Sequence, residues 1–169
     1  VALEQLNNTK IEIVETYHSI VDASDMDCDI EILVMHNTDL SNEESLANLT
    51  KLEDLEINFS NVKDISFLSG LKKLKKLSLI NNDISEYSLL CDLKLDELVF
   101  ACTQVDDWSF VSDLKSLNTL NLAFTNFDDI TLLTSLKKLQ NLDLSYTLID
   151  KLDGIEELKE LETLDLSAC

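Results

Sequence analysis

Pairs of apolar residues recur along this chain at a fixed interval, and that interval limits the possible folds more than any other feature. Successive pairs lie 22 residues apart, except for one 21-residue step at Leu93-Lys94-Leu95. Such self-similarity predicts a solenoid, because each unit buries its apolar face only by stacking on its neighbours. The eight pairs are Ile11/Ile13, Leu33/Met35, Leu55/Ile57, Leu77/Leu79, Leu98/Phe100, Leu120/Leu122, Leu142/Leu144 and Leu164/Leu166.

Each unit carries two kinds of apolar spacing. The alternation around each pair is typical of a short strand with one buried face, whereas the leucines spaced by three before it suit a 3-10 or short helical turn. Stacked units therefore predict an α/β solenoid: a right-handed superhelix with a concave parallel sheet of about eight short strands and a convex side of 3-10 or short helical segments. We expect a single domain, in which residues 1–27 form a degenerate first repeat or amino-terminal cap and residues 28–169 form the solenoid.

A small polar residue follows most pairs by three positions. Asn or Thr at such a position satisfies backbone groups left open where the chain turns out of a strand. Because the column repeats in every unit, we assign it to the scaffold and not to a binding site. Its members are Thr16, Thr38, Ser60, Asn82, Thr103, Thr125 and Thr147, with Cys169 in the last unit.

These units resemble the 22-residue class of leucine-rich repeat found in bacterial internalins and in the leucine-rich regulatory subunit of protein phosphatase 1. Leu71 to Ile84 and Leu136 to Leu152 fit the unit best, and the resemblance covers about residues 28–169. It implies a binding protein, not a catalyst, that grips its partner with the concave strand face. The chain departs from the family pattern where Thr mostly replaces Asn, and no internalin-type cap or downstream immunoglobulin-like region is evident.

The chain is strongly acidic, with a formal net charge of −20 and 13 positive side chains, all of them lysines. Phosphates of nucleic acids and anionic lipids repel such a chain, so neither is an expected partner. A protein with a basic surface is favoured. The first 60 residues carry 14 acids against Lys10 and Lys51, which makes this third the negative pole. No apolar stretch is long enough for a membrane span.

No catalytic, cofactor or metal motif is present, and we expect no enzyme activity and no cofactor. The four cysteines fall at repeat positions too far apart for disulfides, which favours reduced thiols and, slightly, the cytoplasm. A secreted or surface location stays open, because Val1 leaves both a removed signal peptide and a trimmed chain possible.

Residues that flank the buried strand positions should face outward on the concave side. Phe59, Phe124 and Tyr146 stand there where the repeat demands no aromatic, although packing of Phe59 or Phe124 into the core is the alternative. Asp143 and Asp165 should lie side by side, at a cost that a bound basic residue would relieve. The candidate protein-binding residues are Glu12, Val34, His36, Glu56, Asn58, Phe59, Ile80, Val99, Asn121, Phe124, Asp143, Tyr146 and Asp165.

The leading hypothesis is a non-enzymatic module that binds a protein on this acidic, aromatic-bearing face. One alternative is an acidic inhibitor or immunity protein that neutralises a cationic enzyme or toxin. Another is a fragment of a larger bacterial surface or adhesion protein. The last strand ends at Cys169 without a polar terminal repeat, which suggests either further chain or self-association through this edge strand.

Overall fold

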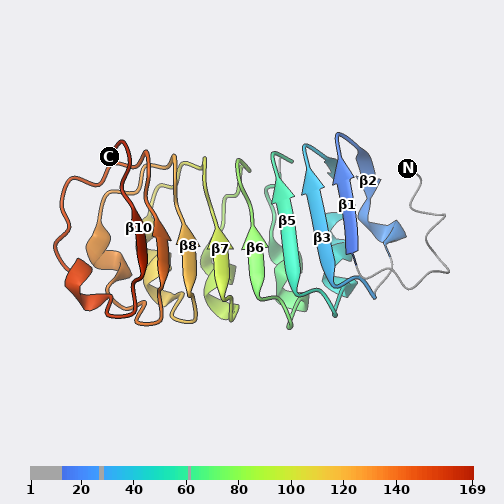
Figure 1. Ribbon diagram of the computed structural model, residues 1–169. Helices are drawn as coiled ribbons and strands as arrows, with labels where there is room; N and C mark the ends of the chain where they lie inside the picture. Colours follow the sequence, from blue (N-terminus) through green and yellow to red (C-terminus); the bar gives the residue numbers. More distant parts are fainter. Residues whose placement is uncertain (1–12, 27–28, 61) are drawn as a thin grey trace.

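The computed structural model is a solenoid with one long parallel sheet (Figure 1), and it describes residues 13–26, 29–60 and 62–169. Neighbouring strands of this sheet follow the order of the sequence, as the stacking of repeats predicts. Its eight strands are β1 (Ile13–Tyr17), β3 (Ile32–His36), β5 (Asp54–Asn58), β6 (Lys76–Ser78), β7 (Glu97–Val99), β8 (Thr119–Asn121), β9 (Asn141–Asp143) and β10 (Thr163–Asp165).

The return segments behind the sheet carry short helices, which are all of the 3-10 type in the described part of the chain. A 3-10 helix has three residues per turn, so leucines spaced by three stay on the side that faces the sheet. The predicted convex side is therefore confirmed. These helices are η2 (Ala23–Asp25), η3 (Glu43–Asn48), η4 (Ser66–Gly70), η5 (Ser88–Asp92), η6 (Trp108–Asp113), η7 (Ile130–Leu133) and η8 (Ile155–Glu157).

A second sheet, which the sequence analysis did not predict, joins the return segments of the first two repeats. Its two parallel strands are β2 (Ile20–Asp22) and β4 (Asp39–Ser41). The Asp22 carboxylate accepts hydrogen bonds from Ser24 and Asn42, and these bonds lower the pKa of Asp22. Asp22 thus links the return segments of the first two repeats.

The core is a stack of leucines from equivalent repeat positions. Leu55 pairs with Leu77, Leu77 with Leu98, and the same alignment continues through Leu120 and Leu142. All five of these side chains are buried. Each strand is only a few residues long, so the sheet is stable because this apolar ladder runs through every repeat.

Aromatic residues enlarge the middle of the core. Phe100 is fully buried, and the ring of Trp108 meets it edge to face at 6.1 Å between centroids. The rings of Phe127 and Trp108 also meet edge to face, with 5.5 Å between their centroids. The indole Nε1 of Trp108 donates to Asn126 Oδ1 at 3.0 Å, so its polar atom is satisfied. Trp108 is thus a core residue, whereas Tyr87 is half-buried.

The alignment of the first repeat differs from the prediction. Val14 pairs with Leu33 and Thr16 with Met35, so the first step is 19 residues and not 22. Val14 is therefore a core residue, although the 22-residue alignment placed it on the concave face. The predicted alignment took the most apolar pair, Ile11/Ile13, as the buried one. The return segment through β2 and η2 is three residues shorter than a 22-residue repeat requires, so the strand register shifts by three residues. The predicted cap of residues 1–27 lies partly outside the described residues.

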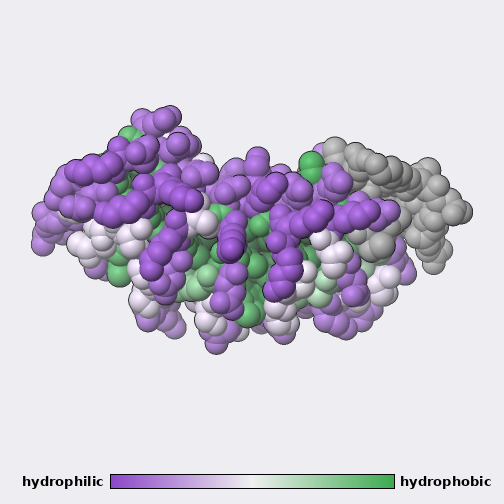
Figure 2. All heavy atoms as spheres, turned by 90° about the horizontal axis from the view of Figure 1, so that it is seen from below, coloured by the Kyte–Doolittle hydropathy of each residue, from purple (hydrophilic) through white to green (hydrophobic). Residues whose placement is uncertain are grey.

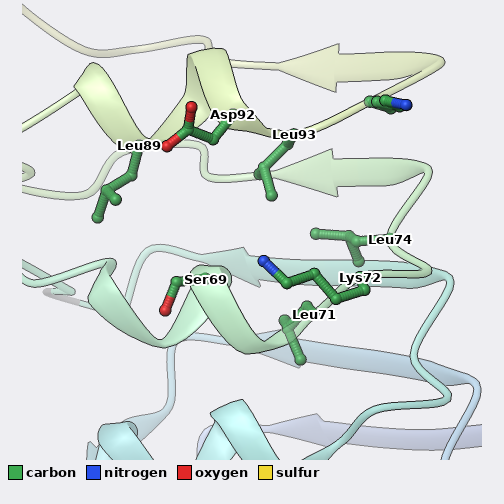
Figure 3. A pocket seen from close by; sticks show the side chains of 8 residues that line it. Ser69, Leu71, Lys72, Leu74, Leu89, Asp92 and Leu93 are labelled. Atoms are coloured by element: carbon green, nitrogen blue, oxygen red, sulfur yellow. The ribbon is translucent and has the colours of Figure 1, made fainter.

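The 21-residue step leaves a hollow on the return side, between η4 and η5 (Figure 3). Leu77 still pairs with Leu98, so the missing residue is absorbed before β7 and not in the sheet. The hollow has a volume of about 300 Å³, and the Lys72 side chain runs across it. Its lining residues are Ser69, Leu71, Lys72, Leu74, Leu89, Asp92, Leu93 and Lys94.

The polar column after each strand has the scaffold role that its periodicity indicates. Asn82 is the most connected member: its Nδ2 donates to the Ile57 carbonyl at 2.6 Å, and its Oδ1 accepts from the Ser60 and Val62 amides. The hydroxyls of Thr125 and Thr147 donate instead to carbonyls of their own repeats. The column thus satisfies buried backbone groups at the turn.

Replacing Asn82 with alanine should lower the free energy of unfolding by about 1–3 kcal/mol, because two amides and a carbonyl lose their buried partner. Asn82→Thr should lose less, since threonine supplies this column in other repeats. Urea denaturation of both variants measures the difference. Equal losses for the two variants would show that a threonine hydroxyl does not replace any of the hydrogen bonds of the Asn82 amide.

Candidate protein-binding surface

The eight-stranded sheet lines the hollowed side of the arc, and the 3-10 helices line its outer side (Figures 1 and 2). Seen from the edge where the strands begin, a hydrophilic layer covers a hydrophobic middle (Figure 2). We call the outward surface of the sheet the concave face. The side chains on it come from alternate strand positions, which form strips that cross the strands.

The central strip lies between the two buried positions of each strand. Strand pairing confirms the neighbours predicted from Val34 onward. The predicted first member, Glu12, lies outside the described residues, and Glu15 is the residue that pairs with Val34. The strip therefore reads Glu15, Val34, Glu56, Ser78, Val99, Asn121, Asp143 and Asp165.

The next strip holds smaller and more buried residues than the sequence analysis expected. Asn58 is buried, with 2% of its surface exposed, and its Oδ1 accepts from Ser78 Oγ and the Ile80 amide. Its assignment as a partner-binding residue is therefore wrong, because its polar atoms are used to join two repeats. Ile80 remains half-buried, while Ala101 and Ala123 form a low floor on the concave face.

The amino-terminal end of the concave face carries a stacked pair of rings. Tyr17 is 55% exposed, and its ring lies parallel to that of His36 at 5.2 Å between centroids. His36 also lies near Glu56, with 3.4 Å between His36 Nε2 and Glu56 Oε2. His36 is thus accessible, as predicted, and held between an aromatic ring and a carboxylate.

A second column, which in most repeats lies one position before the polar column, adopts the left-handed backbone conformation in every described repeat. Phe59, Phe124 and Tyr146 have φ angles of 56°, 58° and 57°. Their amides donate to carbonyls of the following repeat, which extends the ladder by one bond and fixes the conformation. The complete column is His18, Asn37, Phe59, Asn81, Cys102, Phe124, Tyr146 and Ala168.

The aromatic members of this column are exposed, so they do not belong to the core. Phe124 is 52% exposed and Tyr146 is 54% exposed, and their rings stack at 4.2 Å with an interplanar angle of 8°. Phe59 is 47% exposed. Leu148, which is 63% exposed, lies two residues beyond Tyr146. Large apolar side chains therefore gather at the carboxyl-terminal end of the edge where the strands finish.

Asp143 and Asp165 are directly paired on neighbouring strands, as predicted. Asp143 accepts from the Ser145 amide and from Asn121 Nδ2, at 2.9 and 3.0 Å. Asp165 accepts from the Ser167 amide, and hydrogen bonding from Ser167 holds the pKa of Asp165 below its usual value. Both side chains are thus oriented by the backbone of their own repeats.

Two shallow hollows open on the concave face. One, of about 320 Å³, holds His36, Glu56, Ile80 and Val99 with a group of charged residues from the strand starts. Burial raises the pKa of Asp54 in this group, with Glu56 and Glu97 adding to the rise and Lys76 opposing it. The second hollow, of about 290 Å³, is lined by Thr119, Leu120, Asn121, Asn141, Leu142, Asp143, Thr163, Leu164 and Asp165.

Sequence reasoning missed the strip formed by the first residue of each strand, which includes Asp54, Thr119, Asn141 and Thr163. The alternation that placed Glu56 outward also places Asp54 outward, so the signal was present. Tyr17 was missed for a different reason, since the three-residue shift of the first repeat moves it beside His36.

Within residues 13–26, 29–60 and 62–169, no group of three or more His, Cys, Asp or Glu side chains is placed to hold a metal ion. No helix in that part of the chain is long and apolar enough to span a bilayer.

No protein-family model and no curated protein matches the chain. Among solved structures, it is similar to internalin C2 from Listeria monocytogenes, with a TM-score of 0.71 and 22% identity over 92% of this chain and 80% of that chain. It is also similar to TLR13 in a TLR13–ssRNA13 complex, with a TM-score of 0.77 and 24% identity over 98% of this chain and 26% of that chain. The chain thus spans about a quarter of TLR13. These similarities show that the fold is a leucine-rich repeat solenoid.

Proposed function

We propose that this leucine-rich repeat chain is a non-catalytic module that binds a protein partner on its concave face and along the edge where the strands end. The observation that carries the proposal is the exposure of Phe59, Phe124 and Tyr146, which we call the aromatic column. A left-handed backbone costs a non-glycine residue about 1–3 kcal/mol, and asparagine tolerates it better than bulky residues do. Asn37 and Asn81 fill the column in two repeats. Exposed Phe124 and Tyr146 gain little burial in return, so folding alone does not favour them.

The partner we propose is a protein with a basic surface. The chain has a net charge of −20, and the central strip of the concave face carries Glu15, Glu56, Asp143 and Asp165 but no lysine. Complementary charge speeds association and selects among partners. TLR13 is seen with RNA in its complex, but an RNA phosphate backbone would meet repulsion at these carboxylates.

An arginine substitution in the middle of the concave face tests the proposal. Val99→Arg should abolish capture of the partner that the wild-type chain retains from a lysate of its own organism, because the new side chain blocks the face and repels a basic surface. Gln104→Arg, in the exposed loop of the same repeat, adds the same charge outside the face and should leave capture unchanged. Equal capture by both variants, measured by quantitative mass spectrometry, would place the binding surface elsewhere.

The acidic charge also supports a narrower alternative, an inhibitor of a cationic enzyme. Salt separates the two, since exposed charge pairs are screened over about 8 Å at physiological ionic strength. Capture that disappears in high salt supports the inhibitor, whereas salt-resistant capture assigns most of the affinity to the aromatic column. The measurement is the dissociation constant of the purified pair over a salt series.

A further inference from the structure

We propose that the carboxyl-terminal end of the concave face binds an arginine side chain of the protein partner, held between the ring of Tyr146 and the carboxylates of Asp143 and Asp165. This inference rests on the proposed function and specifies the chemistry of its main contact. It starts from the exposed stacked pair, because contiguous exposed apolar side chains mark interaction surfaces.

One face of the Tyr146 ring is open to a ligand. Phe124 covers the other face at 4.2 Å, and the following member of the column is Ala168, which has only a methyl group. The face of an aromatic ring attracts a cation, and a planar guanidinium stacks on it more often than an ammonium does. An arginine would therefore continue the stack of two rings by one layer.

The negative charge of Asp165 is not needed for the backbone hydrogen bond that this residue makes. Asn121 Oδ1 accepts the Ala123 amide at 2.9 Å, and Asp165 Oδ1 accepts the Ser167 amide at 2.8 Å in the equivalent repeat position. A neutral amide thus makes the same bond. Pairing Asp165 directly with Asp143 adds repulsion, since like charges across neighbouring strands are destabilising. The second charge is explained if a cation from a partner lies between them.

No lysine of the described residues supplies that cation. The ion pairs of this part of the chain join other carboxylates, and none includes Asp143 or Asp165. The two carboxylates border the 290 Å³ hollow, which also presents hydroxyls and amides of Thr119, Asn141 and Thr163. This space suits one side chain with several donors. Arginine has five donors in a planar fork that fits carboxylates, whereas lysine presents a single point charge.

Small residues connect the rings to the hollow. Ser145 lies between Asp143 and Tyr146 and is 8% exposed, and Ala123 holds the same position in the preceding repeat at 5%. The surface between the acids and the rings is therefore low. A guanidinium stacked on the Tyr146 ring can therefore extend across this low surface toward the carboxylates, and the aliphatic stem of the arginine can lie along it.

The test is a titration of the isotope-labelled protein, followed by backbone amide chemical shifts, with a capped glycine–serine peptide that carries one arginine. Peptides with lysine or with the neutral isostere citrulline in its place are the comparison. We expect the arginine peptide to shift the amides of Ser145, Tyr146 and Ser167, and the citrulline peptide to leave them unchanged. Equal binding of lysine and arginine, equal binding of citrulline, or shifts confined to other repeats would overturn the inference.

Two variants and a matched control locate the interaction. Asp165→Asn keeps the acceptor for Ser167 and should weaken arginine binding about tenfold, whereas Asp150→Asn, an exposed acid after β9, should change it less than about twofold. Tyr146→Leu keeps apolar bulk but removes the ring face, so the preference for arginine over lysine should fall. An equal loss in Asp150→Asn would reduce the effect to overall charge.

The peptide titration and the partner capture fail separately. Absence of peptide binding, together with partner capture that Val99→Arg abolishes, refutes the arginine site and leaves the concave-face function in place. Peptide binding with capture that Val99→Arg does not affect keeps the arginine site and refutes binding of the partner across the middle of the concave face.

Discussion

Replacing Phe124 and Tyr146 together with alanine should weaken partner binding by about 2 kcal/mol or more while the protein stays folded. The two rings form one stacked unit, and each is about half exposed, with 52% and 54% of its surface accessible. A partner would therefore desolvate large apolar surfaces that the fold itself leaves in water. Isothermal titration calorimetry with the captured partner gives the affinity, and thermal unfolding gives the stability.

The matched control removes an exposed apolar side chain away from this surface. Ile20 is 85% exposed and lies on β2, in the two-stranded sheet, so Ile20→Ala should leave the affinity unchanged. If the double alanine variant unfolds, Phe124 and Tyr146 are core residues and the proposed binding site is wrong. Unchanged affinity in a folded double variant would contradict the aromatic column as the main anchor.

The sequence predicts the solenoid well because its information is periodic. The spacing of Leu55, Leu77 and Leu98 shows that they occupy equivalent positions, so the strand position of one predicts that of the next. Even the shortened repeat keeps Leu98 aligned, because the missing residue falls in a return segment. A register that is stated many times is robust to a local departure.

Single departures from the repeat are harder to predict. The predicted alignment of the first repeat was wrong because this repeat has a neighbour on one side only. Apolarity alone favoured Ile11/Ile13 as the buried pair over Val14 and Thr16. The expected exposure of Asn58 was wrong for another reason. Period-2 alternation predicts on which side of the sheet a side chain lies, but not how deeply neighbouring residues bury it. Its burial depends on Ser78 and Ile80 of the next repeat, which bond to its amide oxygen.

The aromatic column shows why exposure also needs the backbone. From the sequence, Phe59 and Phe124 were equally compatible with packing over the turn. Both residues adopt the left-handed conformation at the end of the strand, and both side chains are exposed there. Position in the repeat and backbone conformation, and not side-chain hydrophobicity alone, therefore separate Phe59 and Phe124 from the buried Phe100.

That contrast predicts the largest stability effect in the chain. Phe100→Ala should lower the free energy of unfolding by about 3–5 kcal/mol, because the side chain is fully buried and its removal leaves a cavity. Its ring lies 5.6 Å from Tyr87, 6.1 Å from Trp108 and 6.3 Å from Phe110, so one substitution removes three aromatic contacts. Urea denaturation followed by circular dichroism measures the loss.

Phe59→Ala is the paired control, since it removes the same atoms from an exposed position of the strand edge. Its cost should stay below about 1 kcal/mol, because the 47% exposed ring gives up little burial and alanine keeps the same strained backbone. Similar losses for the two variants would mean that Phe59 packs as firmly as Phe100. In that case the aromatic column would be part of the scaffold, and the case for a partner on this edge would lose its main support.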